Sequence, residues 1–215
     1  MRLFLHMPKC AGTSVKKMLD ETQVDILPDN QYFLLDSTTS GRSNIPEKSV
    51  IYGHFLPKNY ITDVEQNNYT IVTILRDPIE RLKSHYQFWN LDRGKEFNTR
   101  LWRKMHINRW TFEEFALSEG MRNSYMHYIS GIPPEKIAYI GLYENLEQSI
   151  RRCFGALDIP YPAMAIPKEN VAIDKVDIKL DADTYNSIKA FHADDYALYE
   201  YAKRKFHTEW SNVPQ

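Results

Sequence analysis

Apolar positions along the chain gather in short continuous runs, separated by longer stretches in which they recur at helical spacing. The segment NYTIVTILR, residues 68–76, is apolar or β-branched almost throughout, as expected of a strand buried on both faces. Similar short runs predict further strands at residues 2–6, 31–35, 49–55 and 136–143.

Segments with apolar residues at helical spacing lie between these runs and after them. From residue 13 onward, apolar side chains recur three and four positions apart, which predicts a helix. The same reasoning predicts helices over residues 111–118, 123–130, 144–157, 181–191 and 193–206. Alternating strands and helices predict an α/β fold with a central parallel sheet covered on both faces, and extra helices at the C-terminal end. No shift in composition marks a boundary, so we expect residues 1–215 to form a single domain.

The segment DPIERLKSHYQFWN, residues 77–90, carries the clearest helix signals. Asp77 is a favourable N-cap, Pro78 suits the first turn, and Glu80 would complete a capping box. The apolar stripe of this helix consists of Ile79, Leu82, Tyr86 and Trp89. We therefore expect this stripe to face a core.

Charge and cysteine content narrow the class of protein. A formal net charge of −1 over 215 residues gives no global preference for nucleic acid or for an anionic membrane. Residues 76–109 nevertheless hold nine Lys and Arg against four Asp and Glu, a local excess of 9 − 4 = 5 positive charges. Two cysteines, Cys10 and Cys153, do not suggest a disulfide framework. With no signal peptide and no membrane-length apolar run, we expect a reduced, cytoplasmic protein.

Three features with candidate chemistry each follow a predicted strand. The loop 9–14 follows the first strand, His54 lies at the end of the run 49–55, and Arg76 ends the run 68–76. In open parallel sheets, ligands bind beyond the carboxyl ends of the strands. The three features are therefore expected to share one site.

The first of these features, PKCAGTS at residues 8–14, has the composition of an anion-binding loop. Backbone amides of Gly12, Thr13 and Ser14 at a helix start, together with the charge of Lys9, suit a phosphate or sulfate group. The alternative is an ordinary strand–helix turn with a hydroxyl N-cap. The loop is not a Walker A motif, because Lys9 precedes Thr13 by four positions instead of one.

A second anion site is suggested by Arg76 and Ser84. Ser84 lies two helical turns beyond the start of its helix, and we expect its side chain to lean back toward the N-terminus of that helix. A guanidinium and a hydroxyl converging there suit a second phosphate, with Arg76 as the planar, bidentate partner. The alternative is a surface ion pair and a solvated serine.

Together, PKCAGTS and ILRDPIERLKSHY resemble the sulfotransferase superfamily, in particular the branch of heparan sulfate 2-O- and 6-O-sulfotransferases and its bacterial relatives. YISGIP (128–133) and IGLYENLEQSI (140–150) resemble weaker blocks of that family. The resemblance covers about residues 2–155 and implies a P-loop-like, three-layer α/β/α fold. It also implies 3′-phosphoadenosine 5′-phosphosulfate (PAPS) as the donor, with adenosine 3′,5′-bisphosphate (PAP) as the product and no metal.

The resemblance assigns roles to particular residues. The 5′-phosphosulfate would be bound by Lys9, Ala11, Gly12, Thr13 and Ser14, with Lys9 stabilising the leaving phosphate. The 3′-phosphate would be bound by Arg76 and Ser84, and the late loop PKENVAIDK would add Asn170.

His54, in the context YGHF, resembles the family's general base. Its ordinary pKa near 6.5 would suit that role. His85 is the rival base, and the alternative for His54 is a structural histidine at a strand end. Cys10 in the loop is expected to be a small filler rather than an oxidation-sensitive thiol.

The acceptor is predicted by analogy to be a hydroxyl on a glycan or glycoconjugate. The segment 92–110 supports this prediction, because its basic residues and Trp102 and Trp110, near Trp89, could hold an acidic sugar chain. The alternative there is a solvated basic face over core tryptophans. Two other functions remain open at this point: a P-loop nucleotide or sugar kinase, and a non-catalytic module of the same fold that binds a nucleotide or a glycan.

Overall fold

A five-stranded parallel sheet forms the centre of the molecule, in the order β2-β3-β1-β4-β5. The computed structural model describes residues 1–30, 45–61, 68–90, 99–129, 131–167 and 177–210. The strands are β1 (Arg2–Leu5), β2 (Ile26–Asp29), β3 (Val50–Gly53), β4 (Thr70–Leu75) and β5 (Tyr139–Leu142). The expected α/β architecture with a parallel sheet is therefore confirmed.

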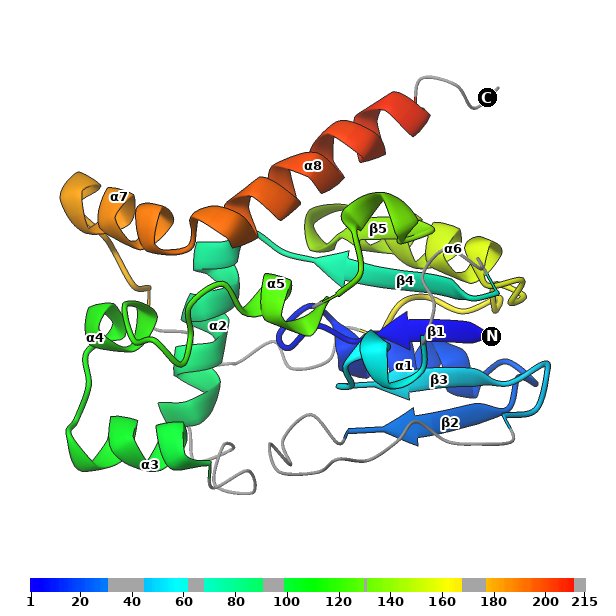
Figure 1. The fold of residues 1–215 in the computed structure, drawn as a ribbon, viewed down its shortest axis with the longest axis horizontal. Helices are drawn as coiled ribbons and strands as arrows, with labels where there is room; N and C mark the ends of the chain where they lie inside the picture. The colour runs from blue at the N-terminus through cyan, green and yellow to red at the C-terminus, as the bar shows by residue number, and fades with distance from the viewer. Residues whose placement is uncertain (31–44, 62–67, 91–98, 130, 168–176, 211–215) are drawn as a thin grey trace.

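Helices surround the sheet and extend beyond its carboxyl edge (Figure 1). The longer ones are α1 (Gly12–Asp20), α2 (Pro78–Asn90), α3 (Arg100–Ile107), α6 (Leu146–Ala156), α7 (Ala182–Phe191) and α8 (Ala193–Trp210). Shorter ones are α4 (Phe112–Ala116), α5 (Ser124–Tyr128), η2 (Pro57–Asn59), η3 (Pro134–Lys136) and η4 (Tyr143–Asn145). Figure 1 shows the strand arrowheads pointing toward α2, with α3, α4 and α7 on the far side of that helix.

Four of the five predicted strands occur within a few residues of their expected positions. The fifth, at 31–35, lies outside the described residues. β2 was not predicted, because ILPD contains Pro28 and Asp29, which are unusual in strands. Proline is tolerated there because β2 pairs only with β3 among the described strands, so a missing backbone N–H need not break a central ladder.

Two hydrophobic cores lie on either side of α2. The larger one is formed by the sheet with its covering helices. The smaller one joins α2 to α3, α4, α7 and α8 and includes Ile79, Leu82, Trp89, Met105, Phe112, Phe115 and Ile188. The predicted apolar stripe of α2 faces this second core, with Tyr86 packed at its margin. α2 thus stands between the sheet and a helical lobe formed by α3, α4 and α7.

The start of α2 confirms the predicted N-cap but only half of the predicted capping box. Asp77 Oδ1 accepts hydrogen bonds from the backbone N–H of Ile79 at 3.0 Å and of Glu80 at 3.1 Å. The N–H of Asp77, however, donates to Glu144 Oε1 at 3.0 Å. Glu80 instead forms an ion pair with Lys83 at 2.9 Å. A carboxylate from η4, distant in sequence, therefore takes the place expected for Glu80.

Candidate functional site

The three features that follow strands in the sequence are brought together at one edge of the sheet. β1 lies between β3 and β4, and Leu5 is in register with Gly53 on one side and Thr73 on the other. The loop after β1, His54 after β3 and Arg76 after β4 therefore leave neighbouring strands in the same direction. The arrowheads of β1, β3 and β4 point toward α2 in Figure 1.

The loop after β1 has the backbone of an anion-binding nest. Lys9 and Ala11 have φ angles of 66° and 64°, in the left-handed region that few non-glycine residues adopt. Such turns direct successive backbone N–H groups to one side. Ala11 is the N-cap of α1, and no side chain among the described residues caps that helix. The alternative of a turn with a hydroxyl N-cap is therefore not what this part of the chain adopts.

Gly12 is required by a close approach between the loop and β1. A Cβ atom built on Gly12 would lie 1.7 Å from Nε2 of His6. The His6 ring is held in place by stacking on Tyr52, with ring centroids 5.7 Å apart. The hydroxyl of Tyr52 in turn donates to the carbonyl of Gly12 at 2.6 Å. The loop therefore sits directly on the His6 ring, and only glycine fits at the contact.

The two hydroxyls of the loop lie in different surroundings. Ser14 is buried, and its Oγ donates to the backbone carbonyl of Pro167 at 2.8 Å. Thr13 has an exposed side chain. Ser14 thus also anchors the segment that precedes residues 168–176, in which Asn170 lies outside the described residues.

His54 is oriented by contacts with the same His6. Its Nδ1 lies 2.7 Å from the carbonyl oxygen of His6, and the two rings stack with centroids 4.3 Å apart. Because a carbonyl only accepts hydrogen bonds, Nδ1 carries the proton and Nε2 carries the lone pair. Burial lowers the pKa of His54 to about 4, against a smaller opposing effect of the His6 carbonyl, so the ring is neutral at pH 7. The expectation of an ordinary pKa near 6.5 is therefore wrong, because the sequence does not show that this ring is buried.

The turn that delivers His54 depends on Gly53. This glycine has a φ of 149°, and a Cβ built on it would lie 1.9 Å from the carbonyl oxygen of Asp29. The backbone N–H of His54 donates to Asn30 Oδ1 at 3.2 Å. Close contact with the end of β2 thus fixes the path of the chain into His54.

Arg76 lies two residues before α2, and Ser84 lies in the middle of that helix. The Arg76 guanidinium lies 4.5 Å from the centroid of the Tyr143 ring and 3.8 Å from Glu80 Oε2, a loose ion pair on a side chain that is 15% exposed. Ser84 is half-buried. One turn beyond it, the Phe88 ring lies beneath Nζ of Lys9, with 3.9 Å between Nζ and the ring centroid. The lysine of the first motif therefore contacts the helix of the second.

His85, the rival base, belongs mainly to the second core. Its ring packs edge-on against Trp89 and Phe115, with centroids 4.5 and 5.8 Å away. Its Nδ1 is buried and has no hydrogen-bond partner among the described residues. Burial lowers its pKa well below the ordinary value, with smaller contributions from Arg81, Lys9 and His54. Within the part of the chain that the structure describes, no hydrogen bond comparable to that with the His6 carbonyl orients this ring.

Tyr125 was missed by the sequence interpretation. Its buried hydroxyl donates to the carbonyl of Arg76 at 2.8 Å and lies 3.5 Å from Sγ of Cys10, so it contacts both motifs. The only signal in the sequence is an aromatic residue within the predicted helix 123–130. Cys10 is itself buried, and burial raises the pKa of its thiol to about 11. This agrees with the interpretation of Cys10 as a filler of the loop.

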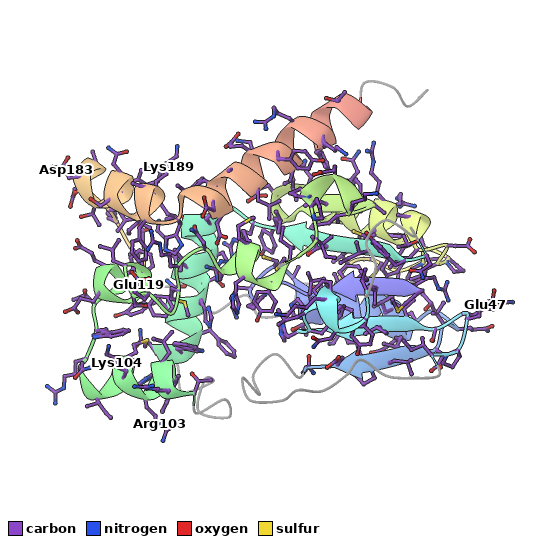
Figure 2. All side chains as sticks on the ribbon, in the orientation of Figure 1. Glu47, Arg103, Lys104, Glu119, Asp183 and Lys189 are labelled. Carbon is purple, nitrogen blue, oxygen red and sulfur yellow. The ribbon has the colours of Figure 1, made fainter. Side chains whose placement is uncertain are left out.

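The tryptophans proposed to stack on sugars pack mainly in the second core. Trp89 is buried, and Trp102 and Trp110 pack against that core's margin. The face of Trp102 is stacked on His106, with centroids 4.0 Å apart. Arg103 and Lys104 on α3 point away from α2 (Figure 2). This favours the alternative of a solvated basic face over core tryptophans for residues 99–110.

Two negative findings apply to the described part of the chain. No group of three or more His, Cys, Asp or Glu residues there is placed to hold a metal ion. No helix within those residues combines the length and the apolar character needed to span a bilayer.

The family profile and the solved structures to which this chain is similar are those of sulfotransferases. The sequence profile described as "Sulfotransferase family" matches residues 3–202. Among solved structures, the chain is similar to a sulfotransferase from Alicyclobacillus acidocaldarius, with 17% identity, 96% of this chain and 95% of that chain covered, and a TM-score of 0.49. It is also similar to the mouse sulfotransferase SULT7A1 complexed with PAP, with 13% identity, 88% and 62% covered, and a TM-score of 0.39. No curated protein matched the chain.

Proposed function

Because the chain belongs to the sulfotransferase family, we propose that it transfers the sulfuryl group of PAPS to a carbohydrate hydroxyl, with His54 as general base. The observation that carries the proposal is the double role of His6. Its carbonyl orients His54, and its ring supports Gly12 in the anion-binding loop. His6 therefore places the proposed base, His54, next to the loop that is proposed to bind the sulfuryl group.

The residues at the two motifs fit a ligand with an anionic group at each end. Lys9 and the backbone amides of Ala11, Gly12, Thr13 and Ser14 would bind the 5′-phosphosulfate at the nest. Arg76 and Ser84 would bind the 3′-phosphate from α2. Asn170 is proposed as a further contact by resemblance alone. The contact between Lys9 and Phe88 supports one ligand spanning both motifs, because it brings the loop against α2.

Bound PAPS supplies an activated sulfuryl group whose bond to the 5′-phosphate breaks during transfer. His54 Nε2 takes the proton of the acceptor hydroxyl as its oxygen bonds to sulfur, and Nδ1 keeps its own proton on the His6 carbonyl. Lys9 and the loop amides stabilise the negative charge that develops on the departing phosphate oxygen. His54 is preferred to His85 because its tautomer is set by a hydrogen bond and its ring stands beside the loop.

The proposal extends to the whole described chain as one domain. α2 contributes Ile79 and Leu82 to the second core, while its first turn follows β4 of the sheet directly. A helix shared in this way supports a single folding unit over residues 1–215. The carbohydrate acceptor rests on the resemblance of the two motifs.

Calorimetric titration with PAP, adenosine 5′-phosphate and ATP with Mg²⁺ tests the donor. We expect PAP to bind about tenfold or more tightly than adenosine 5′-phosphate, since a charge-assisted hydrogen bond contributes about 1.5–3 kcal/mol. Arg76→Ala should remove that preference. Arg122→Ala, a change of equal charge at a side chain that is 52% exposed, is the matched control and should retain it.

Transfer of labelled sulfate from PAPS to a panel of polysaccharides then tests the acceptor. Indifference of binding to the 3′-phosphate, together with turnover of ATP and Mg²⁺, would replace the sulfotransferase proposal by that of a kinase. PAP binding without transfer to any hydroxyl acceptor would favour a non-catalytic module.

A further inference from the structure

Tyr125 contacts the two proposed phosphate sites at the same time. Its hydroxyl donates to the carbonyl of Arg76 at 2.8 Å and accepts from the N–H of Arg76 at 3.2 Å. The same oxygen lies 3.5 Å from Sγ of Cys10, which stands between Lys9 and Ala11 in the nest. One buried oxygen atom thus joins the loop after β1 to the residue after β4.

Burial and contacts with neighbouring elements hold the Tyr125 side chain in a fixed position. It is 0% exposed, and the guanidinium of Arg81 lies 5.2 Å from its ring centroid. The helix that carries it, α5, is tied to α8, because the N–H of Met126 donates to Asp195 Oδ1 at 3.1 Å. Burial keeps the pKa of Tyr125 well above its ordinary value, so the hydroxyl remains protonated and able to donate.

The contact between Arg81 and the Tyr125 ring involves charge as well as packing. It is 1% exposed, and its Nε and Nη2 have no hydrogen-bond partner among the described residues. A buried cation without full pairing costs free energy, and the electron-rich face of Tyr125 offsets part of that cost. The ring of Tyr125 is therefore fixed on one side by a charge and at its tip by the Arg76 backbone.

We propose that Tyr125 is a positioning residue that holds the loop of Lys9 and the Arg76 end of α2 at the separation needed by a nucleotide with phosphates at both ends. The proposal rests on the proposed function and deepens it. A ligand that contacts two sites gains the second contact intramolecularly, at an effective concentration set by how well the two sites are spaced. A rigid spacer favours such a ligand without changing either site's affinity for a single phosphate.

Loss of the Tyr125 hydroxyl should weaken mainly the binding of ligands that contact both sites. Tyr125→Phe keeps the ring on Arg81 but removes the hydroxyl that joins Cys10 to Arg76. We expect the affinity for PAP to fall about three- to tenfold, the range that one net hydrogen bond of about 1 kcal/mol allows. Affinities for adenosine 5′-phosphate and adenosine 3′-phosphate, each binding at one end, should change by less than about twofold.

Calorimetry with these three nucleotides on the full chain is the experiment, with thermal unfolding measured alongside. Tyr86→Phe is the matched control, because the Tyr86 hydroxyl also donates to a backbone carbonyl, that of Trp110 at 2.8 Å, but in the helical lobe. It should leave the preference for PAP over the single-phosphate nucleotides unchanged. Cys10→Ala removes the other partner, and in the Tyr125→Phe background it should weaken PAP binding less than it does alone.

The outcomes separate this inference from the function on which it rests. If the unmodified protein shows no preference for PAP over the single-phosphate nucleotides, the proposed function fails first. If that preference is present and survives in Tyr125→Phe, the spacer role is wrong. Equal losses for all three nucleotides would also overturn it, because they would indicate general damage to the site. A loss for PAP and adenosine 3′-phosphate alone would limit Tyr125 to the Arg76 end.

Discussion

The ring of His54 stacks on the ring of His6, with centroids 4.3 Å apart and an angle of 28° between the planes. Two imidazoles in such contact resist becoming charged together. The pKa of His6 is lowered well below its ordinary value, first by burial and then by His54 and Lys9. The pair is therefore neutral at pH 7, the state in which His54 can accept a proton.

The pH dependence of the reaction should reflect the buried surroundings of the His54 ring. Because the pKa of His54 is lowered to about 4, its neutral form persists well below the ordinary histidine range. We expect kcat/KM for sulfate transfer to stay level from pH 7 to about 5 and to decline as the pH falls through about 4. Initial rates at subsaturating acceptor, measured on enzyme shown to be folded at each pH, provide the measurement. An acid limb near 6.5 would contradict a buried, neutral base.

Replacement of His54 should separate chemistry from binding. His54→Asn is expected to lower kcat by about 10²–10⁴, the usual contribution of a general base, while PAP affinity changes little. His106→Asn is the matched control, because His106 Nδ1 also lies near a backbone carbonyl, that of Trp102 at 3.0 Å, on α3. Retained activity in His54→Asn, with loss in His85→Asn, would transfer the role of base to His85.

A methyl group at Gly12 should disrupt the site through His6. The added Cβ of Gly12→Ala would lie 1.7 Å from His6 Nε2, and the ring is confined between Tyr52 and His54. We expect a loss of about 1–3 kcal/mol in the free energy of unfolding, as for other overpacked sites, and loss of PAP binding. Urea unfolding and calorimetry measure the two effects.

A control glycine and a compensating change sharpen that test. Gly155→Ala in α6 meets no atom within 4 Å, so it should be neutral or stabilise the helix by up to about 1 kcal/mol. Adding His6→Ala to Gly12→Ala should restore part of the stability, since it removes the group that the methyl meets. Additive losses in the double variant would show that the contact with His6 is not the cause.

Acid should weaken the fold before it protonates most carboxylates. The pKa values of His54 and His192 are lowered to about 4, chiefly by burial, and those of His6 and His85 are lowered as well. Below pH 6.5 the unfolded chain binds protons at these positions that the folded chain does not, so stability falls as the pH falls.

Asp195 opposes this trend. Burial raises its pKa to about 6, so the folded state binds a proton there first and gains stability between pH 6 and 4. Burial also raises the pKa of Asp77, which acts in the same direction as Asp195. Four histidines outweigh these two carboxyl groups, and we expect the urea midpoint to decrease from pH 7 to pH 5. An unchanged or higher midpoint at pH 5 would mean that these histidines are not kept neutral.

Much of the site could be predicted from the sequence because its parts are local. A buried run such as residues 68–76 identifies a strand, and the carboxyl ends of parallel strands share one edge. The convergence of the Lys9 loop, His54 and Arg76 follows from those two facts and is confirmed by the strand register. Their roles in catalysis and binding stay predictions.

The supporting contacts could not be predicted, because they join residues far apart in the chain. Nothing local to FLHMPKCAGTS shows that His6 packs on Gly12, or that Tyr125 reaches Cys10 and Arg76. Glu144 displaced Glu80 from the N-cap of α2 for the same reason. The tryptophans left two alternatives open, since an aromatic residue in a basic segment has the same sequence pattern whether it stacks on a sugar or fills a core.

α2 connects β4 of the sheet to the core of the helical lobe, to which buried apolar side chains of α2 such as Leu82 belong. Its first turn follows Arg76, and its last turn carries Trp89 into the core of the helical lobe. A helix is stiff along its axis, so repacking around Trp89 would displace Ser84 and Phe88 as well. A change in the packing of the helical lobe would thus alter the proposed nucleotide site, and we expect the two parts to vary together.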